Sequence, residues 1–250
     1  MAKMRILLYN IEYENGIRGR YEYLKLWRYF QSPKYQDEKI ARFIANEDPD
    51  VVALLEVDLG SVRTRFKDKS LFYKKYFGFN GCAAAPKYPD KNWPRILRKM
   101  PFFRKQGNAL LARNNPKAIR FHWLSEGAKR LLIEAELDNV TLFLAHLSLR
   151  RKTREKQMLE IGNIVSYAEK PVVLMGDFNT FRGEKELDDM LRASGLHKTY
   201  RVKYNSYPAV NPKKQFDYIF VSKGIKVNSF RTLNWQFSDH LPLMMDFTIG

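Results

Sequence analysis

The chain has 250 residues, 45% of them hydrophobic, and a formal net charge of +17. That length and apolar content allow a large core in one folded unit, and the lack of internal repeats or low-complexity tracts excludes solenoid and disordered classes. The only cysteine, Cys82, excludes an internal disulfide and a four-cysteine zinc site.

The chain ends and apolar runs carry little targeting information. The N-terminal sequence MAKMRILLYN has no secretory apolar region followed by a cleavage site, and no stretch approaches the roughly 20 apolar residues of a membrane span. We therefore expect a cytoplasmic protein with one domain over residues 1–250.

Apolar periodicity predicts strands throughout the chain, with helices after some of them. In chain order, the pattern predicts a strand at Arg5–Ile11, a helix at Gln36–Glu47, strands at Val51–Leu55, Asn108–Ala112, Arg130–Leu137 and Val140–Leu147, a helix at Lys152–Ala168, a strand at Val172–Met175, a helix at Glu184–Ala193, and strands at Phe216–Val221, Val227–Leu233 and Leu243–Ile249. Residues 15–35 fit neither helix nor loop clearly, and Pro86–Gln106 is expected to be an exposed loop or short helix. This α/β order favours two packed sheets with helices outside them.

Several apolar strands have, at or next to one of their ends, a polar residue that packing does not require. These residues are Asn10, Glu56, His146, Asp177, Asn179, Asp217, Asp239 and His240. Each one alone is more typical of an ordinary turn or strand end. Together they form a repeated pattern of carboxylates, amides and two of the chain's four histidines, which indicates a shared site.

The segments that carry these residues resemble a known family. LLYNIE, ALLEVD, GNALLAR, AHLS, GDFNT, FDYIF and SDHLPL are similar, in the same order, to the motifs of the endonuclease/exonuclease/phosphatase (DNase I-like) superfamily, and they span residues 7–243. The resemblance implies a four-layer α/β/β/α sandwich of two packed mixed sheets with outer helices. It also implies a metal-dependent phosphoester hydrolase whose site lies at one edge of the two sheets.

The resemblance implies a metal centre built from Glu56, Asn10 and Asp239. Mg²⁺ prefers oxygen ligands and commonly takes one or two carboxylates, so Glu56 and the amide oxygen of Asn10 suit it, and Asp239 would contribute to the same ion or to a second one. The expected cofactor is therefore Mg²⁺, with Mn²⁺ as a substitute. Such an ion offsets the negative charge of a phosphodiester and polarises its phosphoryl oxygen.

The resemblance also implies that the remaining residues take part in catalysis. Asp177 would activate the attacking water, and Asn179 would hydrogen-bond the phosphate or the nucleophile. His240 would stabilise charge on the phosphoryl oxygen, and Asp217 would orient His240 and favour its charged form. His146 would act as a second donor or as the acid for the leaving oxygen.

Two features set this chain apart from parts of the superfamily. Members closest to DNase I pair the first histidine with an acidic residue, but residues 91–125 contain none, which leaves Asp90 as the nearest candidate. The abasic-site branch of the superfamily has a tyrosine near the position of His146, so the histidine argues against membership of that branch. Arg113, at the end of GNALLAR, is a further candidate for a contact with substrate phosphate.

The charge distribution favours a polyanionic partner. Residues 61–130 carry 18 basic and 3 acidic side chains, which predicts a nuclease that binds nucleic acid through this region. The alternatives are a phospholipid phosphodiesterase resembling the sphingomyelinase branch, anchored at an anionic membrane surface by NWPRILRKMPFF, a phosphomonoesterase, or a non-catalytic nucleic-acid-binding module. No obligate protein partner is implied.

Overall fold

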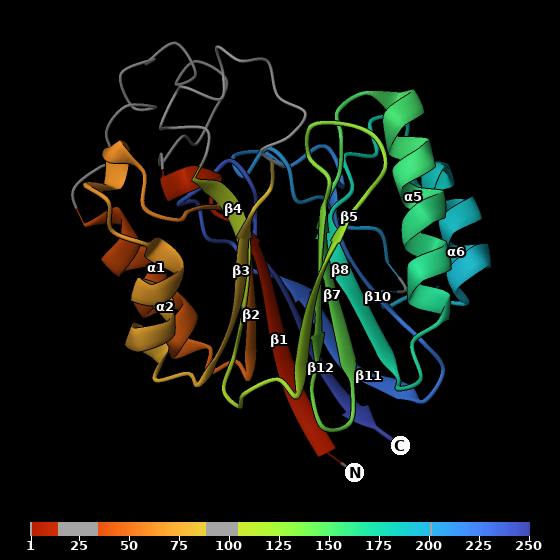
Figure 1. Ribbon diagram of the computed structural model, residues 1–250, viewed down its shortest axis with the longest axis horizontal. Coiled ribbons are helices and arrows are strands. Elements are labelled where there is room, and N and C mark those ends of the chain that lie inside the picture. The colour runs from red at the N-terminus through yellow and green to blue at the C-terminus, as the bar shows by residue number, and fades with distance from the viewer. Residues whose placement is uncertain (1, 15–34, 89–104, 201) are drawn as a thin grey trace.

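In the computed structural model, two six-stranded sheets pack face to face, and helices cover the outer face of each sheet (Figure 1). The structure describes residues 2–14, 35–88, 105–200 and 202–250. Helices α1 (Gln36–Asn46) and α2 (Lys69–Phe77) lie outside the first sheet, and α5 (Arg151–Ser166) and α6 (Asp188–Ser194) lie outside the second. The four-layer α/β/β/α sandwich is therefore confirmed.

Both sheets are mixed. The first has the order β11-β12-β1-β2-β4-β3 and the second the order β5-β6-β7-β8-β10-β9. The strands of the first sheet are β1 (Ala2–Asn10), β2 (Val51–Asp58), β3 (Gly81–Pro86), β4 (Gln106–Ala112), β11 (Ile225–Thr232) and β12 (Leu243–Ile249), and those of the second are β5 (Ala118–Trp123), β6 (Leu131–Glu136), β7 (Thr141–His146), β8 (Val172–Asp177), β9 (His197–Lys198) and β10 (Asp217–Val221). Each sheet contains one parallel pair, β1 with β2 and β7 with β8, so these four strands all end at the same edge of the molecule.

Side chains of the central strands point alternately to the two faces of each sheet and fill three apolar layers. In β7, Leu142 and Leu144 face the opposite sheet, whereas Phe143 and Ala145 pack with the helices on the outer side. Because both faces are covered, such strands appear in the sequence as continuous apolar runs. A polar residue at the end of such a run therefore stands out, as His146 does at the end of β7.

The structure confirms each of the predicted strands and helices, most of them with shifted ends. The strand predicted at Val51–Leu55 continues to Asp58, and the helix predicted at Glu184–Ala193 consists of a 3₁₀ turn (Glu184–Leu187) followed by α6. Most of the loop predicted at Pro86–Gln106 lies outside the described residues, as does nearly all of the unassigned segment 15–35. No helix among the described residues is long and apolar enough to cross a membrane.

Three substantial elements had no clear sequence signal. Helix α2 is poorly amphipathic, and its ends depend on Asp68, whose side chain accepts from the backbone N–H groups of Ser70 and Leu71, and on Gly78 in the left-handed region at φ 65°. Strand β3 is made of small residues with weak strand preference. Strand β5 lies at a sheet edge, and both its faces are at least partly exposed.

Candidate active site

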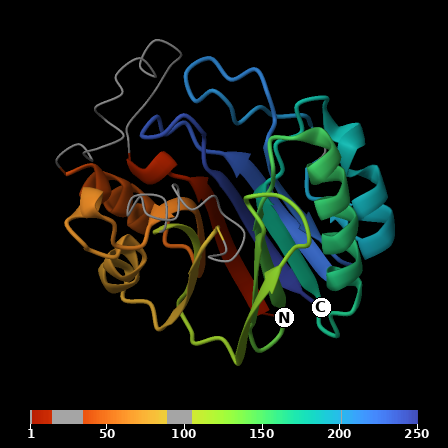
Figure 2. The ribbon, with the colours of Figure 1, turned by 45° about the horizontal axis from the view of Figure 1, so that its top comes forward.

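Three of the predicted residues lie in one row across the second sheet. Register pairs His146 at the end of β7 with Asp177 at the end of β8, and Asp177 with Asp217 at the start of β10. All three side chains are buried and belong to the face that meets the first sheet. Figure 2 brings this edge of the two sheets toward the viewer.

The backbone around Asp177 explains the GDFN motif. Gly176 has a φ of 155°, and a Cβ on it would lie 1.9 Å from the carbonyl oxygen of Ala145 on the neighbouring strand. Only glycine tolerates this approach. Asn179 adopts a left-handed φ of 51°, its backbone N–H donates to Asp177 Oδ1 at 3.0 Å, and its side chain donates to the Leu147 carbonyl at 3.1 Å. The motif thus fixes the position of the Asp177 carboxylate.

The first sheet contributes Asn10 and Glu56. Asn10 ends β1, and its Nδ2 lies 3.4 Å from Asp177 Oδ2, so this contact joins the two sheets. Glu56 sits in an irregularity of β2, with a left-handed φ of 57°, and its backbone N–H donates to Asn108 Oδ1 at 3.3 Å. The bulge interrupts the alternation of β2 and leaves the Glu56 side chain partly exposed among buried neighbours.

His240 and Asp217 form a buried pair. His240 Nδ1 lies 2.7 Å from Asp217 Oδ2, which also accepts from Ser206 Oγ at 2.6 Å. Burial opposes a charge on His240, but the negative charges of Asp217 and Asp239 and the hydrogen bond to Asp217 outweigh it, so the pKa of His240 is well above its usual range. His240 is therefore a cation at neutral pH, while Asp217 Oδ1 is buried without a hydrogen-bond partner.

Asp177 is suited to accept a proton. Burial, followed by the negative charge of Asp217, raises the pKa of Asp177 to about 7. A carboxylate with a pKa near neutrality holds a proton more strongly than an ordinary surface aspartate while still being partly ionised. This property agrees with the predicted activation of water.

Two lysines that the sequence analysis did not single out complete the site. Lys87 Nζ lies 2.9 Å from Glu56 Oε1, and Lys129 Nζ lies 3.8 Å from the same atom. Lys129 Nζ is also hydrogen-bonded to His146 Nε2. Burial raises the pKa of Glu56, but the two lysines outweigh it and lower that pKa, whereas burial and Lys129 hold the pKa of His146 well below its usual value. The only signal for these lysines was their place in the basic region 61–130.

The structure does not bring Arg113 to this site. It follows the last residue of β4, which runs antiparallel to β2, so Arg113 lies beside the start of β2 and Glu56 near the end of that strand. Its guanidinium forms ion pairs with Asp48 and Asp50. The structure therefore does not support the predicted contact between Arg113 and a substrate phosphate at this site. Asp90, the acidic candidate beside His146, lies outside the described residues.

Two neighbouring groups of residues could hold a metal ion. Asp177, Asp217 and His240 offer atoms that all lie within 4.8 Å of one another. These three residues were predicted as catalytic, whereas the predicted ligands, Asn10, Glu56 and Asp239, lie at the same edge and offer oxygen atoms. Asp239 is buried, and one of its carboxylate oxygens lies 3.9 Å from His240 Nε2.

Comparisons with known proteins agree with the fold. The model of the Endonuclease/Exonuclease/phosphatase family matches residues 10–240. A solved endonuclease/exonuclease/phosphatase from Beutenbergia cavernae is 18% identical with a TM-score of 0.74, over 99% of this chain and 72% of that one. The human Nocturnin catalytic domain, solved with bound sulfate, is 20% identical with a TM-score of 0.65, and the match covers 99% of this chain and 95% of that one. A mannosyl-6-phosphatase from Bacteroides thetaiotaomicron is 14% identical with a TM-score of 0.68, and the match covers 98% of this chain and 100% of that one. At these identities the structural likeness concerns the fold.

Proposed function

The chain belongs to the endonuclease/exonuclease/phosphatase family of phosphoester hydrolases, and on that basis we propose that it is a Mg²⁺-dependent nuclease that hydrolyses phosphodiester bonds of DNA or RNA. The observation that carries the hydrolytic part is the buried pair of Asp217 and His240 beside Asp177. This arrangement puts a stable cation and a carboxylate of raised pKa at the same edge of the two sheets, where water attack on a phosphate needs them.

The donor set fits a hard divalent cation. Asn10, Glu56 and Asp239 offer oxygen atoms, as Mg²⁺ prefers, and Mn²⁺ would be accepted by the same ligands. His240 is a poorer ligand, because a protonated imidazole hydrogen-bonded to Asp217 has no free lone pair. We therefore assign the ion to the oxygen ligands, with Asp177 and Asp217 nearby. When bound, Mg²⁺ would offset the negative charge of the phosphate.

The side chains divide the remaining work between them. Asp177 takes a proton from the water whose oxygen attacks phosphorus, and Asn10 Nδ2, at 3.4 Å from Asp177 Oδ2, helps to orient the carboxylate. His240 faces the phosphoryl oxygen as a cation and stabilises the charge that grows there as the water oxygen bonds to phosphorus. The phosphorus–oxygen ester bond then breaks, and the leaving oxygen takes a proton from the surrounding water. Asp217, fixed by Ser206, keeps His240 charged and oriented.

The basic region supports a polymeric anion as substrate. Residues 61–130 contain 18 of the 44 lysines and arginines of the chain but only 3 of its 27 acidic residues. Among its described members, Lys87 and Lys129 lie inside the site, so this positive charge continues into the catalytic edge. A nucleic acid carries the regular negative charge that such a region would bind.

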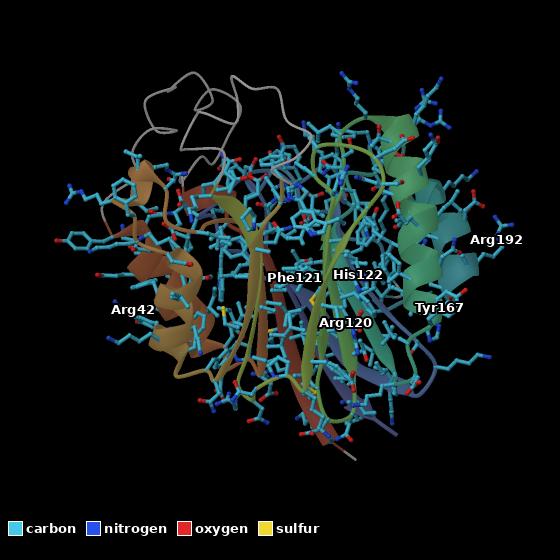
Figure 3. The ribbon with its side chains drawn as sticks, viewed as in Figure 1. Arg42, Arg120, Phe121, His122, Tyr167 and Arg192 are labelled. Carbon is cyan, nitrogen blue, oxygen red and sulfur yellow. The ribbon has the colours of Figure 1, made fainter. Side chains whose placement is uncertain are left out.

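One exposed aromatic residue extends the catalytic row, and a second lies two residues from it on the same strand. Trp123 on β5 pairs with Leu131 on β6, and the register of β6 with β7 brings Leu131 beside His146. Trp123 is therefore two strands from His146, about 10 Å at the usual strand spacing. Trp123 and Phe121 are 42% and 41% exposed, and Figure 3 labels Phe121 on this strand. Bases next to the scissile phosphate would stack on such rings.

The test is hydrolysis of plasmid DNA, single-stranded RNA, phospholipid vesicles and a small phosphomonoester in Mg²⁺, with His240→Ala purified in parallel to control for contaminating enzymes. We expect cleavage of nucleic acid by the wild type and its loss in the variant. Cleavage of lipid alone would move the protein to the phospholipase alternative. Release of phosphate from small monoesters alone would make it a phosphomonoesterase, and no turnover of any phosphoester would contradict the proposal.

The nuclease proposal has a second, independent test in its salt dependence. Binding of a polyanion through several lysines and arginines releases counterions, so affinity should fall steeply between 50 and 200 mM salt, roughly as expected for multiple phosphate contacts. Fluorescence anisotropy with a labelled oligonucleotide and the inactive His240→Ala protein measures this. A salt-independent affinity would remove nucleic acid as the substrate.

A further inference from the structure

Three nitrogen atoms converge on a single anionic oxygen in the site. Around Glu56 Oε1 lie Lys87 Nζ at 2.9 Å, Lys129 Nζ at 3.8 Å and His146 Nδ1 at 3.8 Å. The Lys87 side chain is 2% exposed and that of Lys129 is 16% exposed. This is a donor cradle for an oxyanion, and a carboxylate oxygen lies at its centre.

The orientation of the His146 ring leaves one donor without a partner. His146 Nε2 is hydrogen-bonded to Lys129 Nζ and also lies 3.3 Å from Asp177 Oδ2, and because an ammonium group can only donate, we take Nε2 of the neutral imidazole as the acceptor. The ring proton is then on Nδ1, which is buried and makes no hydrogen bond. Buried donors are nearly always satisfied in native proteins, and no described residue places an acceptor within hydrogen-bond distance of Nδ1–H, so this donor is open to a ligand.

The charges in this corner are also unbalanced. Within the described parts of the chain, Glu56 is the only carboxylate within 4.0 Å of either lysine Nζ, and Asp177 is a further, more distant negative charge that acts on Lys129. The rings of Tyr13 and Tyr88 flank Lys87, with centroids 4.9 and 5.3 Å from its Nζ, and limit its access to water. An excess positive charge in a buried place is costly unless an anion joins it.

We propose that Lys87 and Lys129 bind the phosphoryl group of the substrate, with His146 Nδ1 as a third donor. The two ammonium groups take non-bridging oxygens of the phosphate, next to the position that Glu56 Oε1 fills. This role deepens the proposed phosphoester hydrolysis and rests on it. It also requires that the protein bind a phosphate ion without any metal, which the oxygen-ligand cluster alone would not do.

The experiment is isothermal titration calorimetry of inorganic phosphate into the protein in EDTA. The variants are Lys87→Gln and Lys129→Gln, and the matched control is Lys152→Gln, which removes an exposed lysine of α5. We expect the wild type and the control to bind phosphate, and each site variant to bind at least about tenfold more weakly, since each loses a charge-assisted hydrogen bond. Melting temperatures show whether each variant folds. Lys87→Arg and Lys129→Arg, which keep the charge, should retain more affinity than the glutamine variants.

A second titration, with Mg²⁺ and no phosphate, separates the proposal from a simpler role. If the lysines serve only as counterions of Glu56, the glutamine variants will bind Mg²⁺ more tightly and phosphate as well as the wild type does. That result would overturn the proposal, and so would a wild type that binds no phosphate in EDTA. A third pair of results is that the glutamine variants lose phosphate binding while the wild type cleaves no nucleic acid in the hydrolysis test. That pair of results would support the phosphate site and contradict the nuclease proposal.

Discussion

His240 Nδ1 lies 2.7 Å from Asp217 Oδ2, and both side chains are buried at the edge where the two sheets meet. The negative charge of Asp217 keeps His240 protonated despite its burial. Asp217→Asn keeps a similar shape and removes that charge. We expect kcat to fall by about 10²–10³-fold, the usual cost of losing a preorganised charge at a developing oxyanion. Initial rates on the substrate found in the hydrolysis test, at saturating Mg²⁺, measure this.

Ser206→Ala is the matched control for Asp217→Asn. Ser206 donates to the same carboxylate oxygen at 2.6 Å, so its loss weakens the fixing of Asp217 but leaves the charge in place. The rate should fall by less than in Asp217→Asn. If Asp217→Asn retains near-normal turnover with an unchanged melting temperature, His240 does not act as a cation in the reaction.

The same pair predicts how stability depends on pH. The pKa of His240 is raised in the folded state, so its contribution to the free energy of unfolding is fully present below the unfolded pKa of about 6.5 and is lost as the pH rises through the folded pKa. The wild type should therefore melt at a higher temperature than His240→Gln. This difference in melting temperature should be largest at about pH 6 and should shrink toward alkaline pH. Thermal melts in EDTA from pH 6 to 10 measure it, and a difference that grows with pH would contradict the assignment.

The fold was largely predictable from the sequence because the central strands are covered on both faces. Runs such as that of β8 (Val172–Asp177) are apolar throughout, so they stand out and end at a polar residue. Helix α2 and strands β3 and β5 were not predicted, because they lie at the periphery, where caps, small residues and edge exposure replace apolar periodicity.

The candidate site was predictable where a polar residue lies at or next to either end of an apolar strand. His146 and Asp177 do so, and the family resemblance gave them roles. Lys87 and Lys129 belong to segments with many other lysines and arginines. The folded chain brings them together where the end of β3 meets the start of β6, with a hydrogen bond from the Arg130 N–H to the Lys87 carbonyl. Arg113 shows the reverse error, because motif membership does not say at which end of an antiparallel strand a residue lies.

The position of Arg113 gives a prediction about the limits of the site. Arg113 is half-exposed and paired with Asp48 and Asp50 at the far end of β2. Arg113→Ala should leave kcat and KM within about twofold of the wild type, and its effect on the free energy of unfolding should stay below about 1 kcal/mol, as for exposed ion pairs. Steady-state kinetics and urea melts decide this. A large increase in KM would show that substrate extends to this end of the sheets.

Glu56→Gln tests the assignment of the metal ion. The substitution keeps an oxygen atom but removes the charge that a divalent cation needs, so the affinity for Mg²⁺ should fall at least about tenfold. Calorimetric titration of Mg²⁺ into both proteins measures this directly, without turnover. Asp217→Asn is the informative comparison, because an ion held by Asp177, Asp217 and His240 would be lost there instead and would be retained in Glu56→Gln.

Gly176→Ala tests whether the close approach of β7 and β8 fixes the position of Asp177. The new Cβ would lie 1.9 Å from the Ala145 carbonyl oxygen, so one of the two strands must move. We expect a loss of about 3 kcal/mol or more in the free energy of unfolding, in the range of severe backbone substitutions. Gly78→Ala is the matched control: it also has a left-handed φ, of 65°, but nothing lies within 4 Å of the added Cβ. That variant should lose only about 1–2 kcal/mol. Equal losses in urea unfolding would mean that backbone conformation alone, rather than the approach of the strands, requires glycine at position 176.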